Sequence, residues 1–123
     1  MLAGGTGITP MFQILQAAHK NQDETNFSII FGNKTSQDIL MKKELDEIYQ
    51  SKSFNFNLNY LIDKHDEGWE GLVGYVNKDM IIKYLPAPGD DTIILICGPP
   101  IMCQKSKDIL MDLGYNKESI YEF

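Results

Sequence analysis

Arginine is absent from this chain and cysteine is scarce. All eleven basic residues are lysines, so the planar guanidinium group that holds a phosphate through two parallel hydrogen bonds is missing. The two cysteines, Cys97 and Cys103, have neither a CxxC spacing nor a second pair. This pattern argues against a disulfide framework or a zinc site and predicts a reducing compartment with no bound metal.

Long apolar runs and basic clusters are missing as well. No stretch reaches the eighteen or so apolar residues that a transmembrane helix needs, so we expect none. The net charge is -6, and such a surface repels nucleic-acid phosphates, which argues against nucleic acid as a partner. With 123 residues and 43% hydrophobic content, the chain can bury one core, and we expect a single domain over residues 1–123.

A glycine-rich turn begins the chain, with the sequence Ala3-Gly4-Gly5-Thr6-Gly7-Ile8-Thr9-Pro10-Met11. Glycines let the main chain approach a bulky anionic ligand, and a helix start offers unpaired N–H groups to it. Thr9 as the N-cap and Pro10 as the first helical residue predict the helix start. Proline stands where the dinucleotide fingerprint has its third glycine, so a plain tight turn is an alternative.

A second turn, Cys97-Gly98-Pro99-Pro100-Ile101-Met102, follows the strand-like run Thr92-Ile93-Ile94-Leu95-Ile96. Pro100 predicts the start of another helix, which ends at Gly114. Further strands are expected at 27–31, 54–62 and 119–123, the second of them at a sheet edge. Two more helices are expected, one from about Asp38 as its cap and one capped by Asn77.

This alternation predicts an α/β fold, with a three-layer arrangement of a parallel sheet of about five strands in the order 3-2-1-4-5 and helices on both faces. Ligands in such sheets lie outside the carboxyl ends of the strands, where the winding reverses. The two turns follow strands one and four, which are neighbours at that reversal. We therefore expect both turns to flank one crevice.

The ordered motifs along the whole chain closely resemble the nucleotide-binding half of the ferredoxin reductase superfamily, specifically NADH-cytochrome b5 reductase and the reductase module of nitrate reductases. The matching segments are Gly4–Met11, Gly32-Asn33-Lys34-Thr35, Asp38-Ile39-Leu40, Glu44-Leu45, Tyr60-Leu61-Ile62-Asp63, Gly74-Tyr75-Val76-Asn77, Leu85-Pro86, Cys97-Gly98-Pro99-Pro100 with Met102, and Phe123. The resemblance implies a ferredoxin-reductase-type nucleotide-binding domain and an oxidoreductase.

The resemblance also implies roles for single residues. Thr6 lies between flavin and nicotinamide, and Cys97 helps to hold the nicotinamide for hydride transfer. Asp63 accepts hydrogen bonds from the adenosine ribose and repels a 2'-phosphate, which predicts NADH over NADPH. The full set of implied cofactor-binding residues is Gly4, Gly5, Thr6, Gly7, Thr9, Pro10, Asn33, Asp63, Cys97, Gly98, Pro99, Met102 and Phe123.

From the residues alone, plainer interpretations stay open. Thr6 and Asp63 are also typical turn formers, Cys97 is also typical of a buried strand end, and Phe123 is also typical of a core residue at a strand end. The resemblance favours the functional interpretation for Thr6, Asp63 and Cys97 and leaves both interpretations open for Phe123.

The function implied by the resemblance is passage of hydride from NADH to FAD and then of electrons to a haem protein such as cytochrome b5. In the family an FAD-binding barrel precedes this domain, and neither that barrel nor the full first strand is expected in these 123 residues. The FAD-binding domain is then a partner in cis or in trans. The alternative is a free nucleotide-binding or structural subunit of a larger assembly without redox activity. The resemblance implies a cytoplasmic location, with attachment to the cytosolic face of the endoplasmic reticulum or mitochondrial outer membrane through another segment.

Overall fold

The computed structural model describes residues 1–123, and strands alternate with helices along most of the chain. The strands are β1 (Leu2–Gly4), β2 (Phe27–Asn33), β3 (Phe56–Ile62), β4 (Leu72–Val73), β5 (Ile94–Cys97) and β6 (Ile120–Glu122). The α-helices are α1 (Ile8–Asn21), α2 (Lys42–Ser51), α3 (Lys78–Tyr84) and α4 (Pro100–Asp112). Short 3-10 helices are η1 (Gly5–Gly7), η2 (Ser36–Asp38) and η3 (Lys117–Ser119).

The six strands form one parallel sheet in the order β4-β3-β2-β1-β5-β6. The predicted order of five strands is confirmed, and β4 is an addition that the sequence did not indicate. It pairs with Leu61 and Ile62, so the predicted edge position of 54–62 is wrong at the carboxyl end of that strand. Two residues inside a glycine-rich loop carry too little periodicity to predict a strand.

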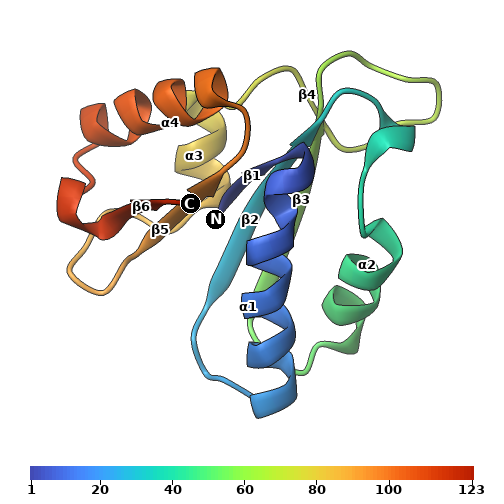
Figure 1. Ribbon diagram of the computed structural model, residues 1–123, viewed down its shortest axis with the longest axis horizontal. Helices are drawn as coiled ribbons and strands as arrows, with labels where there is room; N and C mark the ends of the chain where they lie inside the picture. Colours follow the sequence, from blue (N-terminus) through green and yellow to red (C-terminus); the bar gives the residue numbers. More distant parts are fainter.

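Helices cover both faces of the sheet, with α1 and α2 on one side and α3 and α4 on the other (Figure 1). Successive side chains of a strand point to opposite faces. Ile29 and Phe31 accordingly pack beneath α1 and α2, whereas Ile30 packs on the side of α3 and α4. All three side chains are fully buried, which fixes the register of the central strands because a slip of one residue would exchange the two faces.

The start of α1 differs from the prediction. The helix begins at Ile8, and Gly7 occupies the N-cap position without any side-chain hydrogen bond. Thr9 and Pro10 lie inside the first turn, so the predicted N-cap role of Thr9 is wrong. The reason is that η1 runs directly into α1, with Gly7 already in helical conformation, and this leaves no extended residue near Thr9 that could act as a cap.

The helix predicted from Asp38 also begins later. Asp38 ends η2, and its carboxylate accepts a hydrogen bond from the Thr35 hydroxyl at 2.9 Å. Ile39 then turns into the core, where only 8% of its surface is exposed, and α2 starts at Lys42 after Met41 in left-handed conformation. Burial of Ile39 therefore interrupts the segment and displaces the helix start by one turn.

Other predicted boundaries are confirmed. The Asn77 side chain accepts a hydrogen bond from the Met80 amide at 2.9 Å and caps α3. Pro100 opens α4, and Gly114, with a φ of 92°, follows its end as expected for a glycine after a helix. No helix combines the length and the apolar character that crossing a bilayer requires.

The amino group of Met1 lies inside the sheet rather than in solvent. It donates a hydrogen bond to the Ser28 carbonyl at 2.7 Å. Burial lowers its pKa to about 5, because the charged form loses its hydration. Strand β1 is fully enclosed from Leu2 onward.

Candidate functional site

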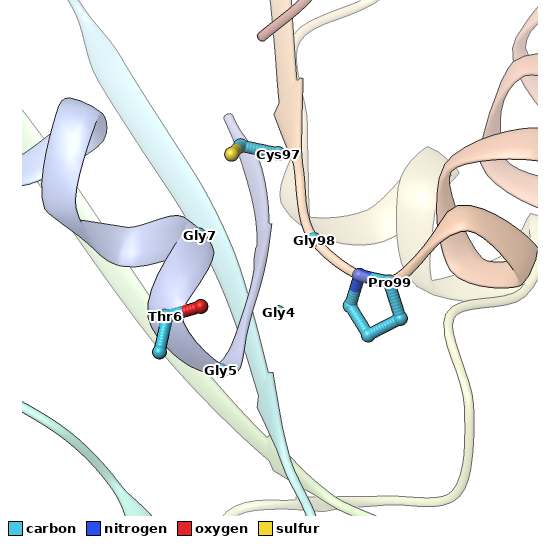
Figure 2. A pocket seen from close by; sticks show the side chains of 7 residues that line it. All are labelled: Gly4, Gly5, Thr6, Gly7, Cys97, Gly98 and Pro99. Atoms are coloured by element: carbon cyan, nitrogen blue, oxygen red, sulfur yellow. The ribbon is translucent and has the colours of Figure 1, made fainter.

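The two predicted turns meet at the carboxyl edge of the sheet. Strand β1 pairs with β5, with Ala3 opposite Cys97, so η1 and the turn after β5 leave the sheet side by side. Between them lies a hollow of about 310 Å³. Its lining consists of Gly4, Gly5, Thr6, Gly7, Cys97, Gly98 and Pro99, which Figure 2 shows at close range. The expected single crevice is present.

Glycine is required here because the two turns touch through their main chains. A Cβ on Gly7 would lie 2.1 Å from the carbonyl oxygen of Cys97, which is too short for any non-bonded contact. A Cβ on Gly4 would lie 2.5 Å from Sδ of Met102, a side-chain atom that would have to move. At Gly5 the reason for glycine is the backbone conformation rather than crowding. A Cβ there would meet open space, but the φ of +53° is one that residues with a side chain rarely adopt.

Two helix starts border the hollow. Neither the N-cap of α1, Gly7, nor that of α4, Pro99, makes a side-chain capping hydrogen bond. The Ile8 amide already donates to the carbonyls of Gly5 and Thr6, and Pro10 and Pro100 carry no N–H, so this edge offers an anion chiefly the partial positive charge of the two helix dipoles. Such an arrangement suits an anionic group such as a diphosphate.

Only two lining residues offer reactive or hydrogen-bonding side chains, namely Thr6 and Cys97. Thr6 is exposed and Cys97 is partly buried. In Figure 2 the Thr6 hydroxyl is turned towards the Gly98–Pro99 turn, and the Cys97 thiol towards the turn that carries Gly7. The hollow has no carboxylate, imidazole or amine in its lining, so it can bind and orient a ligand but is not built for acid–base chemistry.

Two further predicted residues lie close to the hollow without lining it. Met102 forms a wall behind Gly4 and Gly98, since its sulfur would lie within 3.1 Å of a Cβ on either residue. The Phe123 amide donates to the carbonyl of Ile96 at 2.9 Å, which brings the chain end beside the carboxyl end of β5. The Phe123 side chain is 60% exposed, so the interpretation of Phe123 as a core residue is wrong.

Thr9 and Pro10, by contrast, lie in the first turn of α1 outside the hollow. Cys103, which the sequence indicated as a packing residue, is 3% exposed in the core on the α4 side. Its thiol donates to the Gly98 carbonyl at 3.5 Å, and burial raises its pKa. Cys103 thereby holds the Gly98–Pro99 turn from the side of the core.

Asn33 and Asp63 lie farther along the same sheet edge, at the carboxyl ends of β2 and β3. Asn33 pairs with Ile62 in the sheet, and neighbouring strands are about 4.8 Å apart, so the edge from β5 to β3 spans about 14 Å. Asn33 is only 7% exposed, and its amide nitrogen has no hydrogen-bond partner. Asp63 is partly buried and belongs to neither ion pair of the chain.

A connection between the loops after β2 and β3 was not predicted. Oδ2 of Asp66 accepts hydrogen bonds from the amide and the hydroxyl of Ser36, at 2.9 and 2.8 Å. These bonds hold the pKa of Asp66 below its ordinary value. No sequence pattern indicates a contact between two polar residues thirty positions apart, although Ser36 follows β2 by three residues and Asp66 follows β3 by four.

A parallel sheet with a glycine-rich hollow at its reversal point and two uncapped helix starts defines a nucleotide-binding domain of the ferredoxin reductase type. Comparison with known proteins agrees with this class. Residues 1–108 match the family described as "Oxidoreductase NAD-binding domain". The chain belongs to this family.

Individual relatives narrow the likeness to cytochrome b5 reductases. NADH-cytochrome b5 reductase 1 of Dictyostelium discoideum is 45% identical over 124 residues, which cover 100% of this chain and 43% of that protein. The solved cytochrome b5 reductase domain of Ulva prolifera nitrate reductase superposes with a TM-score of 0.94 at 33% identity, covering 100% of this chain and 47% of that one.

A third relative is the solved structure of the CS-b5R domains of human Ncb5or in its NAD+ form. It has a TM-score of 0.85 at 26% identity, covering 99% of this chain and 35% of that one. The chain thus spans less than half the length of these relatives.

Proposed function

We propose that the chain is the NADH-binding half of a flavoprotein reductase, which passes hydride from NADH to FAD and electrons onward to a haem protein such as cytochrome b5. The observation that carries the proposal is the hollow between η1 and the turn after β5, where two uncapped helix starts and four glycines face one space. The name of the Dictyostelium discoideum relative, an NADH-cytochrome b5 reductase, supports NADH as the coenzyme.

The residues present fit a dinucleotide in two respects. Gly5 lines the hollow and has open space where a Cβ would be, so an extended ligand can approach the backbone closely there, while Gly4, Gly7 and Gly98 let the two turns pack against each other. At the other end of the edge, the unpartnered amide nitrogen of Asn33 is a buried donor, and buried donors are rarely left without an acceptor.

Each implied residue then has a definite task. The backbone of Gly4, Gly5 and Gly7 surrounds the diphosphate, while Thr6, Cys97, Gly98 and Pro99 enclose the nicotinamide. Met102 forms the wall behind it, and Phe123 lies on the side towards FAD. Asn33 donates to the ligand, and Asp63 accepts from the adenosine ribose. Thr9 and Pro10 contribute by setting the start of α1.

When bound, NADH would donate a hydride to FAD, and FAD would pass the two electrons to the acceptor one at a time. The chain's own residues contribute position, by holding the nicotinamide face open to the flavin and by excluding water from the hollow. This division of labour agrees with a lining that has no acid–base group. The FAD-binding domain, in cis or in trans, holds most of the flavin.

A chimera tests the proposal. The 123-residue chain replaces the corresponding part of the Ulva prolifera reductase domain, which it matches over its full length. We expect NADH to bleach the flavin absorbance of the purified chimera in a stopped-flow measurement, and NADPH to do so far more slowly. A folded, flavin-loaded chimera that binds NADH without flavin reduction would instead support the nucleotide-binding subunit without redox activity.

A further inference from the structure

Two loops at the carboxyl edge are joined by a single side chain. The loop after β2 carries Ser36, and the loop after β3 carries Asp66. One carboxylate oxygen of Asp66 accepts from both the amide and the hydroxyl of Ser36. Hydrogen bonds to an ionised acceptor are stronger than neutral ones. We call this pair of hydrogen bonds the Ser36–Asp66 clasp.

The clasp lies next to Asp63, the residue to which the proposed function assigns coenzyme choice. The Asp63 amide donates to the carbonyls of Asn33 and Lys34 at 3.1 and 3.3 Å, so the main chain of Asp63 is tied to the loop after β2. Three residues later Asp66 ties it again, through its side chain. The Asp63 carboxylate is in neither ion pair, and its direction therefore depends on how these two ties hold its backbone.

The rest of the loop after β3 is anchored independently of the clasp. The Trp69 ring nitrogen donates to the Leu72 carbonyl at 3.0 Å, and its ring packs against the core on the α1 side. The Gly74 amide donates to the Ile62 carbonyl at 2.8 Å. The Trp69 amide also donates to the Asp66 carbonyl at 3.0 Å, so loss of the clasp would loosen residues 63–65 and leave the rest of the loop and the fold in place.

Lysines flank this position, since Lys34 and Lys64 adjoin the two tied segments and both are exposed. A 2'-phosphate at the ribose end would meet these two positive charges as well as the carboxylate of Asp63. The ratio of NADH affinity to NADPH affinity then depends on how firmly the Asp63 carboxylate is held towards the ribose, because Lys34 and Lys64 attract the 2'-phosphate of NADPH.

We infer that Asp66 is a positioning residue for coenzyme selection, which acts through Ser36 to hold the Asp63 carboxylate towards the adenosine ribose. This inference rests on the proposed function, because it needs the ribose to lie at Asp63. Asp66 itself touches no ligand in this account. Its effect is on the ratio of the two coenzyme affinities rather than on binding of the dinucleotide as a whole.

The test measures NADH and NADPH dissociation constants on the full 123-residue chain by calorimetric titration. For Asp66→Ala we expect NADH to bind about 5-fold more weakly, NADPH to bind no more weakly than before, and the NADH/NADPH preference to narrow by at least 5-fold. Asp66→Asn keeps an acceptor oxygen and should restore most of the preference. Glu67→Ala, which removes the same charge from the same exposed loop but no hydrogen bond of the structure, should leave the ratio unchanged.

Hydrogen exchange at the Asp63 amide supplies the second readout. We expect it to accelerate in Asp66→Ala, with a melting temperature close to that of the parent. An unchanged NADH/NADPH ratio in Asp66→Ala, with or without faster exchange, overturns the inference. If the unaltered chain binds neither coenzyme, the titrations are made on the chimera with the Ulva prolifera reductase domain. There, absence of flavin reduction by NADH rejects the proposed function, whereas an unchanged NADH/NADPH ratio in Asp66→Ala rejects this inference alone.

Discussion

Gly7→Ala is expected to destabilise the chain by about 3 kcal/mol and to weaken NADH binding by at least about 10-fold. The added Cβ would lie 2.1 Å from the Cys97 carbonyl oxygen and 2.5 Å from the Cys97 carbonyl carbon. Both are main-chain atoms of a central strand, so no side-chain rotation relieves the clash. The start of α1 and the end of β5 must separate, which opens the hollow. Thermal unfolding should show a melting temperature lower by on the order of 10 °C.

Gly32→Ala is the matched control for this change. Gly32 lies on β2 opposite Gly4 in the same sheet, yet a Cβ there would have its nearest neighbour at 3.8 Å, which is ordinary contact. Its stability should change by less than about 0.5 kcal/mol. Equal melting temperatures for the two variants would contradict the close approach of the two turns.

Asp63→Thr is expected to narrow the NADH/NADPH preference by at least about 10-fold. A hydrogen bond to a charged acceptor contributes about 1.5–3 kcal/mol, and its loss weakens NADH binding. The same change removes a negative charge that would oppose a 2'-phosphate, and it leaves Lys34 and Lys64 in place. Competition titrations with both coenzymes measure the ratio.

Glu70→Gln serves as the control for charge, because Glu70 is exposed on the same loop and belongs to neither ion pair. It should leave the ratio unchanged. If Asp63→Thr also leaves the NADH/NADPH ratio unaltered, the assignment of Asp63 to the ribose is wrong, and Asp63 is only a turn residue after β3.

The sequence could predict the sheet because its strongest signals are local. Buried runs such as Ile29-Ile30-Phe31 stand between helical patterns, and alternating strands and helices allow few topologies once the crossover rule applies. The sheet order and the meeting of the two turns then followed without any knowledge of contacts. The strand Leu72–Val73 was missed because two residues have no measurable period.

Helix starts were harder to predict because tertiary packing overrides local capping preference. The sequence predicts Thr9 as the N-cap and Pro10 as the first helical residue. The 3-10 helix Gly5–Gly7 instead continues directly into α1, which begins at Ile8. Asp38 looked like a cap, but the burial of Ile39 determined the path of the chain there. In both cases the expected capping residue is present, but the path of the chain beside it, set by η1 before Thr9 and by the buried Ile39 after Asp38, places the helix start elsewhere.

The candidate site also has a part that the sequence could predict and a part that it could not. The residues of the hollow come from two contiguous motifs, so the sequence predicted them as a group. The Ser36–Asp66 clasp joins loops whose separation in the sequence is long, and neither residue belongs to a motif. The unpartnered amide of Asn33 is likewise a property of the packed chain, since nothing in Gly32-Asn33-Lys34 shows that its nitrogen is buried.

The central proposal is that NADH binds along the carboxyl edge of this sheet, and a titration of the isotopically labelled 123-residue chain with NADH, followed through its amide NMR signals, tests it most directly. The account predicts saturable shifts at Gly5, Gly7 and Gly98, extending along the sheet edge to Asn33 and Asp63. A chain that shows dispersed signals of a folded domain, yet gives no saturation into the millimolar range or shifts only away from this edge, would contradict it.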